Sequence, residues 1–265
     1  MTPFLETTRN GDVFILTMNR PQTHNAVSDP DAIEALLAAF SQINVNREVR
    51  AVVLTGVGSA FSSGGNVRKL REQVGAGLGQ PVLSRHAYRD GIQQLPRALY
   101  ELEVPTIAAV NGHAIGAGMD LACMCDIRIA SSNAKFACSF IKLGLVPGDG
   151  GAWLLPPLVG RSRAAELAFT GRAIDAAQAL EDGLVSQVVE PQALLPTALA
   201  LAQEIAAHPG LALRMTKRLL REGEHARLDT LLELSAAFQA LAHHTPEHEE
   251  RLAAFSSGQV KAVTR

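Results

Sequence analysis

The amino-acid sequence predicts an α/β protein with a helical C-terminal region. Apolar, β-rich runs alternate with helical patterns over most of the chain. Two of these runs, at 51–55 and 106–110, are continuously apolar, which is typical of strands buried on both faces of a sheet. After Pro191 the alternation stops and only helical patterns follow. We therefore expect two regions, residues 1–195 and residues 196–265.

The composition is that of a globular protein. With 265 residues the chain can bury a large core, and its 47% hydrophobic and 19% charged residues argue against a disordered chain. A net charge of -2, without a Lys/Arg run interleaved with aromatic residues, predicts no nucleic-acid partner. No apolar run approaches the roughly 20 residues that span a bilayer. Residues 1–13 lack the basic and apolar regions of a secretory signal. We expect no membrane association and a cytoplasmic location.

The three cysteines are Cys123, Cys125 and Cys138. An odd number clustered in apolar sequence is typical of buried thiols in a reducing compartment and not of a disulfide framework. The Cys-x-Cys pair has no His or acidic partner at ligand spacing, whereas a closed zinc site needs four ligands. We therefore predict no metal site.

Local signals predict the elements of the first half. A turn at 10–12 precedes a strand at 13–18. The run SDP at 28–30 offers a capping side chain followed by proline at the first helical position, and apolar residues then recur at three- and four-residue spacings. Further elements are expected in order: a strand at 51–55, a helix at 66–72, a Gly-rich loop at 75–81, a helix at about 84–101 and a strand at 106–110.

The second half is punctuated by glycine and proline. Two short helices are expected in the run WLLPPLVGRSRAAELAFTG, broken at its two prolines, 156 and 157, and at Gly160. A further helix begins near Ile174, and the last strand covers 184–189. Four helical runs complete the chain, at about 192–207, 210–222, 227–242 and 246–256.

The stretch 106–151 carries the pattern with the clearest chemical meaning. Its apolar strand leads to a Gly-Ala-Gly corner at 116–118, where a helix begins. The first turn of a helix has backbone N–H groups without helical partners, and glycine lets a ligand approach the backbone closely. The same stretch holds two acids, Asp120 and Asp149.

A similar pattern occurs earlier in the chain. The predicted strand at 51–56 is followed by the run SSGG at 62–65 and a predicted helix. If the N–H groups at two such helix entrances converge on one oxygen, they form an oxyanion hole that stabilises negative charge on a carbonyl. The alternative is that both are ordinary turns of a parallel α/β domain and that both acids are solvated.

The nucleotide and hydrolase motifs that would suggest other functions are incomplete. The dinucleotide pattern G-x-G-x-x-G lacks its third glycine both at Gly56 and at Gly116, and the sequence has no P-loop. A nucleophile elbow around Ser63 would need glycine at position 61, where the chain has Phe61. The histidines are scattered and are interpreted as surface or packing residues, with substrate contact by His113 as an alternative.

Several motifs together resemble the crotonase (enoyl-CoA hydratase/isomerase) superfamily, in the right order over almost the whole chain. They are NRP at 19–21, NA at 25–26, AFSSGG at 60–65, AVNG at 109–112, GAG at 116–118, CDIRIA at 125–130, GLVP at 144–147 and GLV at 183–185. The resemblance implies a crotonase/ClpP-type spiral of ββα units with a C-terminal helical trimerisation region. It also implies a homotrimer, or a hexamer built from two trimers. The substrate would be an acyl-CoA thioester, with coenzyme A as part of the substrate and no separate cofactor.

The resemblance assigns roles to individual residues. Gly65 and Ala117 match the two oxyanion-hole donors, whose N–H groups would hold the thioester oxygen. The positions that line the acyl-CoA groove are matched by Asn25, Ala26, Ser63, Gly64, Asn66, Val67, Arg68 and Gly116. Contacts to the CoA phosphates would come from Arg68, Lys69 and Arg71, or from Lys261 and Arg265 near the C-terminus.

The acid/base residues depart from the two glutamates of the family's hydratases. The first position matches Asp120, and the second matches Phe140, which cannot transfer a proton and would shape the acyl pocket together with Trp153 and the 75–81 loop. Asp149, in the turn PGDGG, is the expected substitute. The family name favours hydration of a 2-enoyl-CoA, whereas the missing second glutamate favours an enoyl-, dienoyl- or epoxyacyl-CoA isomerase. A hydrolase or lyase and a catalytically silent acyl-CoA-binding paralogue stay open.

Overall fold

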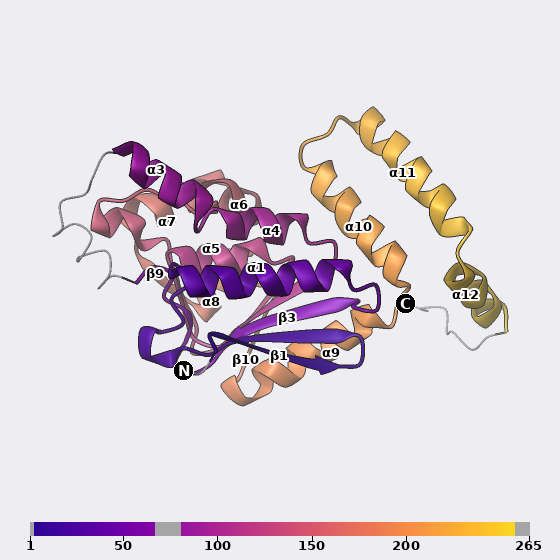
Figure 1. Cartoon of the computed structure of the whole chain (residues 1–265), viewed down its shortest axis with the longest axis horizontal. Coiled ribbons are helices and arrows are strands. Elements are labelled where there is room, and N and C mark those ends of the chain that lie inside the picture. The colour runs from indigo at the N-terminus through magenta and orange to yellow at the C-terminus, as the bar shows by residue number, and fades with distance from the viewer. Residues whose placement is uncertain (1–2, 67–80, 258–265) are drawn as a thin grey trace.

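The computed structural model describes residues 3–66 and 81–257, which form an α/β protein with two sheets (Figure 1). In the larger sheet only β1 runs antiparallel to its neighbour. Its strands are, in spatial order, β1 (Leu5–Asn10), β2 (Val13–Met18), β3 (Ala51–Gly56), β5 (Thr106–Val110), β7 (Ile127–Ser131) and β10 (Gln187–Val189). The smaller sheet has the order β4 (Ala60–Ser62), β6 (His113–Ile115), β8 (Lys135–Ala137) and β9 (Ala173–Asp175).

Helices connect and cover these strands. The longer ones are α1 (Pro30–Val45), α3 (Pro81–Asp90), α4 (Gln94–Glu101), α5 (Ala117–Met124), α6 (Gly151–Val159), α7 (Arg161–Thr170), α8 (Ala176–Glu181), α9 (Leu194–Ala206), α10 (Gly210–Gly223), α11 (Leu228–His243) and α12 (Pro246–Ser256). Short 3-10 helices are η1 (Pro21–Thr23), η2 (Ser139–Leu143) and η3 (Pro191–Ala193).

The chain advances through the two sheets in repeated units. The pairs β3–β4, β5–β6 and β7–β8 each put their first strand in the larger sheet and their second strand in the smaller one. Successive units lie side by side in parallel register, with Val53 beside Ile107 and Ile107 beside Ile127. This repeat confirms the predicted α/β class and the expected ββα units.

The central strands of the larger sheet, β3 and β5, are buried on both faces. Val53 and Ile107 point to one face, where they pack against Ala198 of α9. Leu54 and Ala108, the next residues along the same strands, point to the opposite face and join the core formed with α1, α4 and α5. Because neither face meets water, the two central strands are continuously apolar in sequence.

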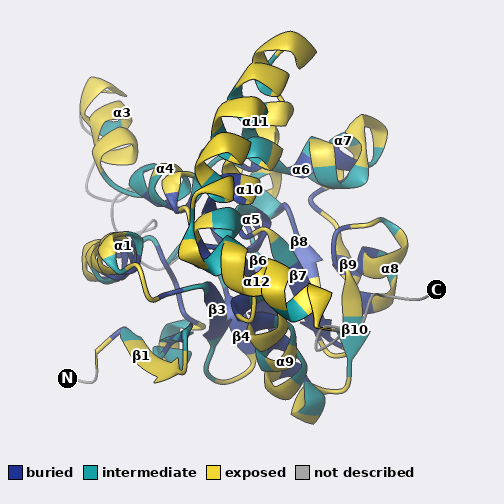
Figure 2. Cartoon of the chain, turned by 90° about the vertical axis from the view of Figure 1, so that its right-hand side faces the viewer, coloured by how far each residue is buried: buried dark blue, intermediate teal, exposed yellow. Residues whose placement is uncertain are grey.

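The C-terminal helices α10, α11 and α12 extend away from the two-sheet body (Figure 1). Neither α11 nor α12 has a buried residue, and most of their surface is exposed (Figure 2). The residues at 196–206 lie in α9, which packs on the larger sheet. The division of the chain at residue 195 stays a prediction.

Some elements differ from the expectation. The strands of the smaller sheet were not predicted because each has three residues, too few to show an alternating pattern. The single helix expected at 84–101 is two helices, with an interruption between Asp90 and Gln94. Helix α6 continues through Pro156 and Pro157 and ends at Val159, with Gly160 as its C-cap. The predicted strand at 184–189 begins only at Gln187.

The shorter last strand has a local cause. The backbone N–H groups of Leu184 and Val185 both donate to the carbonyl of Ala179 in α8. These amides therefore close the end of a helix instead of joining the sheet.

Several predictions fall on residues that the structure leaves undescribed. They are the helix at 66–72 beyond its first residue, most of the 75–81 loop, the groove residues Val67 and Arg68, and the phosphate-contact candidates Lys69, Arg71, Lys261 and Arg265. Among the helices at 3–66 and 81–257, none combines the length and apolar character needed to cross a bilayer.

Candidate active site

The two glycine corners predicted from the sequence lie directly against each other. A β-carbon on Gly64 would lie 2.6 Å from the backbone nitrogen of Ala117 and 2.5 Å from the carbonyl oxygen of Ile115. A β-carbon on Gly118 would lie 2.0 Å from the carbonyl oxygen of Ser62. Only glycine allows this approach, so these residues bring the loop after β4 to the first turn of α5.

Two backbone amides are left available at this contact. Within the described ranges, neither the N–H of Gly65 nor that of Ala117 donates a hydrogen bond to the protein. Ala117 is the first residue of α5, where a backbone N–H has no helical acceptor. The corner before it is Gly116, at a φ of 55° that favours glycine. An oxyanion hole requires two such free donors that point at one oxygen.

Both predicted acids are buried beside this corner. Asp120 is 3% exposed and lies on α5, one turn after Ala117, and Asp149 is 4% exposed in the turn before α6. Asp120 Oδ2 accepts a hydrogen bond of 3.2 Å from the N–H of Gly151. A β-carbon on Gly151 would lie 2.2 Å from Asp120 Oδ1, so glycine is needed where the turn meets the helix.

The two carboxyl groups differ in their proton affinity. The pKa of Asp120 is raised to about 8, first by burial and then by the negative charge of Asp149, while the hydrogen bond from the Gly151 N–H acts in the opposite direction. Burial raises the pKa of Asp149 to about 6. With these pKa values the pair of carboxyl groups holds one proton at neutral pH. Asp149 Oδ1 is buried and has no hydrogen-bond partner among the described residues.

Helices α3 and α4 hold the turn that carries Asp149. Gln93 Nε2 donates a hydrogen bond of 2.8 Å to the carbonyl oxygen of Gly148. The ring of Tyr88 lies against the same residue, because a β-carbon on Gly148 would be 3.2 Å from Tyr88 Cε1. Burial, followed by the negative charge of Asp149, raises the pKa of the Tyr88 phenol. No local sequence pattern connects Gln93 to Gly148, 55 residues away, or Tyr88 to the same turn.

Phe140 lies beside the Gly116 corner. A β-carbon on Gly116 would be 3.7 Å from Phe140 Cζ and 3.6 Å from Ser139 Oγ. Phe140 is half-buried in η2 and packs against the main core. An apolar ring therefore borders the Gly116 corner. Ser139, whose hydroxyl faces the same corner, had no recognisable sequence signal.

The other predicted groove residues mostly engage the protein itself. Asn25 and Ala26 are fully buried. Ser63 Oγ donates to the Thr23 carbonyl at 3.0 Å, and the N–H of Asn66 donates to Ser28 Oγ at 3.0 Å. Their assignment to the acyl-CoA groove stays a prediction.

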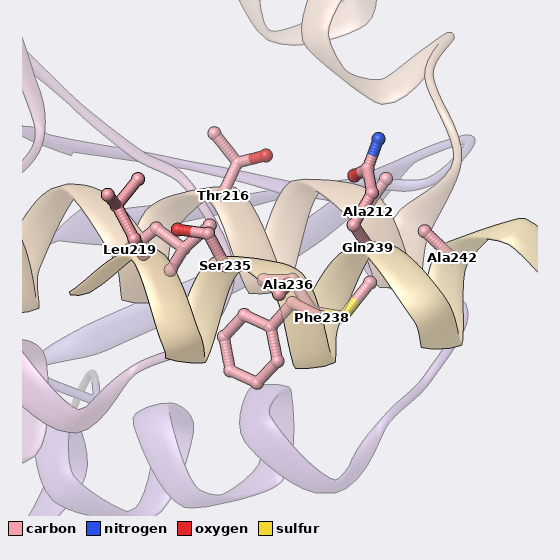
Figure 3. Close-up of a pocket in the computed structure, with 10 residues that line it drawn as sticks. Ala212, Thr216, Leu219, Ser235, Ala236, Phe238, Gln239 and Ala242 are labelled. Atoms are coloured by element: carbon pink, nitrogen blue, oxygen red, sulfur yellow. The ribbon is translucent and has the colours of Figure 1, made fainter. Parts of the chain in front are cut away.

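Neither the cysteines nor the hollow between α10 and α11 offers comparable chemistry within the described residues. The three cysteines are buried free thiols, and the described residues contain no cluster of three His, Cys, Asp or Glu side chains that could hold a metal ion. A hollow of about 390 Å³ lies between α10 and α11. Figure 3 shows the residues that line it. These lining residues have no titratable side chain. Neither the two aspartates nor the two free backbone amides are among them.

In this α/β protein, two backbone amides without an acceptor among the described residues therefore lie near two buried carboxyl groups. The chain belongs to the enoyl-CoA hydratase/isomerase family, whose model matches residues 8–258. It is 38% identical over 243 residues to the 1,2-epoxyphenylacetyl-CoA isomerase of Escherichia coli, covering 92% of this chain and 91% of that protein. It is 36% identical over 251 residues to the short-chain-enoyl-CoA hydratase of Clostridium acetobutylicum, covering 93% and 92%.

A solved structure agrees with this assignment. The enoyl-CoA hydratase of Bacillus anthracis superimposes with a TM-score of 0.89 at 34% sequence identity, over 96% of each chain. The predicted crotonase-type spiral and the predicted superfamily are therefore confirmed, and the chain is an enzyme of this family.

Proposed function

We propose that this enzyme isomerises an unsaturated or epoxy acyl-CoA by proton transfer through an enolate. The thioester oxygen accepts hydrogen bonds from the N–H groups of Gly65 and Ala117, and Asp149 and Asp120 move the protons. The observation that carries the proposal is the pair of buried carboxyls, with pKa values of about 6 and about 8, next to two unpartnered amides.

The proposed steps balance for a 3-enoyl-CoA. Ionised Asp149 takes a proton from Cα, and the electron pair moves to the thioester oxygen, where each N–H contributes roughly 3–4 kcal/mol of stabilisation. Neutral Asp120 then gives its proton to Cγ while the electrons return to form the Cα–Cβ double bond. A proton passing between the two acids restores the starting state.

Isomerisation is favoured over hydration because Phe140 replaces the acid that would share the task of holding water. Its apolar ring borders the oxyanion corner. The similarity to the isomerase of Escherichia coli is in line with this choice. Hydration of a 2-enoyl-CoA is the second candidate, because the similarity to the hydratase of Clostridium acetobutylicum is nearly as high. Two buried acids with separated pKa values argue against a silent acyl-CoA-binding paralogue.

The test compares crotonyl-CoA hydration with 3-enoyl-CoA isomerisation in the wild type and in Asp149→Asn. We expect isomerisation to be the faster reaction and to lose roughly 10²–10⁴-fold in kcat in the variant, which is the usual contribution of a general acid or base. Asp175→Asn, at the exposed cap of α8, serves as the control and should keep full activity. Full activity of Asp149→Asn would end the role assigned to that residue.

We also propose that the chain assembles as a homotrimer or a hexamer through its C-terminal helices. The support is a set of large apolar side chains exposed on α11 and α12: Leu228, Leu232, Leu241, Leu252 and Phe255. Leaving such a surface in water is unfavourable, and burying it between copies removes that cost. Light scattering of the purified chain would give the mass; a monomer at micromolar concentration would contradict the proposal.

A further inference from the structure

The loop that carries Gly65 is held by the segment before α1, which we call the 20–28 frame. The bonds between them involve nearly every residue of the loop. They are Ser62 Oγ to the Asn25 carbonyl (2.8 Å), the Ser63 N–H to the His24 carbonyl (2.8 Å), Ser63 Oγ to the Thr23 carbonyl (3.0 Å), the Val27 N–H to the Gly64 carbonyl (2.9 Å) and the Asn66 N–H to Ser28 Oγ (3.0 Å). The N–H of Gly65 is the donor that these bonds leave unused within the described part of the loop.

Asn25 ties this frame to the sheet. Its Oδ1 accepts a hydrogen bond of 2.9 Å from the Arg20 N–H. Its Nδ2 donates to the carbonyl of Val57, just after β3, at 3.0 Å and to that of Ala60, the first residue of β4, at 2.8 Å. The residue is 0% exposed, and both amide protons are used. The side chain therefore joins the frame to the β3–β4 connection and has no polar surface left for a ligand.

The backbone of the frame is held in an uncommon conformation. His24 and Asn25 both have positive φ, at 51° and 55°, a region that side chains other than glycine seldom adopt. Asn tolerates this region better than most residues, because its short amide bonds locally. The Asn25 side-chain amide packs directly against Gly56: a β-carbon at residue 56 would lie only 2.7 Å from Asn25 Nδ2. Strain of this kind persists when surrounding bonds enforce it, and it is frequent at functional sites.

We propose that Asn25 is a positioning residue: through the 20–28 frame it sets the direction of the Gly65 N–H, and it does not touch the acyl-CoA. The inference rests on the proposed oxyanion role of Gly65. It replaces the groove contact that the sequence suggested for Asn25 with a role in the alignment of the donor.

Two variants separate the side-chain bonds from the backbone conformation. Asn25→Asp keeps the shape and the acceptor for the Arg20 N–H, but it turns an oxygen toward the two carbonyls that Nδ2 now serves. Asn25→Gly keeps the positive φ without strain and removes all three bonds. Ile43→Val, in the buried face of α1 and away from the frame, is the control for a loss of stability without a loss of alignment.

Steady-state kinetics give the first readout. We expect both variants to lose about 10–100-fold in kcat, because a small misplacement of a catalytic group costs up to about that factor, while KM stays within about threefold. The control should keep its kcat after allowance for any change in Tm. A rise in KM with unchanged kcat would show that Asn25 contacts substrate and would overturn the inference.

The second readout is the carbonyl stretch of bound [1-13C]butyryl-CoA, a saturated thioester that cannot be isomerised. Hydrogen bonds from an oxyanion hole lower this frequency, so we expect a low frequency in the wild type and the control, and a higher one in both Asn25 variants. Equal lowering in all four proteins would refute the positioning role alone. No lowering in the wild type would refute the oxyanion assignment and the inference with it. Lowering in the wild type that the variants lose would support the inference even if no substrate were turned over.

Discussion

Asp120→Asn should make the protein more stable at neutral pH while it removes activity. The folded chain holds Asp120 in a buried site that raises its pKa from 3.8 to about 8. Below about pH 4 the group is protonated in both the folded and the unfolded chain, so the contribution of its raised pKa to stability is fully present. As the pH rises toward 8, the unfolded chain releases the proton that the folded chain keeps, and this contribution is lost.

The size of the effect follows from the shift. One pKa unit corresponds to about 1.4 kcal/mol, and pH 7 lies roughly three units above the ordinary pKa of an aspartate. Ionisation of Asp120 in the unfolded chain therefore lowers the free energy of unfolding by on the order of 4 kcal/mol at pH 7. An asparagine does not titrate, and its Oδ1 can still accept the Gly151 N–H. The variant should gain most of this free energy between pH 5 and 8.

Urea unfolding at fixed protein concentration, repeated from pH 5 to 8.5, measures this difference directly. The gap between Asp120→Asn and the wild type should widen as the pH rises. Asp31→Asn is the matched control: Asp31 is exposed, and its hydrogen bond with Arg20 lowers its pKa. The stability that the Asp31–Arg20 pair contributes is present above the ordinary pKa of an aspartate. Asp31→Asn should therefore lower the free energy of unfolding slightly at neutral pH, the opposite of the effect of Asp120→Asn. A gap for Asp120→Asn that does not change with pH would refute the reasoning.

Two further predictions follow from the same contacts. The pH profile of kcat should be bell-shaped, rising near pH 6 as Asp149 ionises and falling near pH 8 as Asp120 loses its proton; a flat profile over pH 5–9 would contradict the pairing. Gly151→Ala should lower both Tm and kcat, because the new β-carbon would lie 2.2 Å from Asp120 Oδ1 and overpacking costs about 1–3 kcal/mol. Gly210→Ala, also at the first position of a helix but with its nearest neighbour 3.7 Å from the new β-carbon, should leave both unchanged.

The predictable part of the fold is the part with long, regular patterns. The strand at 51–55 and the helix that begins at Pro30 could be predicted because one is continuously apolar and the other repeats apolar residues every three or four positions. The three-residue strands of the smaller sheet carry no such signal, and they form because the loops after β3 and β5 are drawn together. These short strands depend on tertiary contacts, which a local sequence pattern does not reveal.

The candidate site divides in the same way. Gly65, Ala117 and the two aspartates could be named because they stand in recognisable motifs. That Asp120 would meet the Gly151 N–H, 31 residues away, could not be read from those motifs. The support given by Gln93 was equally hidden, because it depends on how α4 packs over the turn.

Burial of the two aspartates both strengthens the electrostatic interactions at this site and lowers the stability of the folded chain. Removing water from around Asp120 and Asp149 raises their pKa values, and the same low polarisability strengthens each N–H···O contact with a developing enolate. Asp149 Oδ1 is buried without a hydrogen-bond partner within the described structure, so no hydrogen bond offsets the desolvation cost of its negative charge. On the proposed mechanism, a substrate Cα–H next to that oxygen relieves the penalty by neutralising the carboxylate at the moment when charge appears on the thioester. In this mechanism the negative charge moves from the Asp149 carboxylate, whose Oδ1 lacks a hydrogen-bond donor among the described residues, to the thioester oxygen, which accepts from the Gly65 and Ala117 N–H groups.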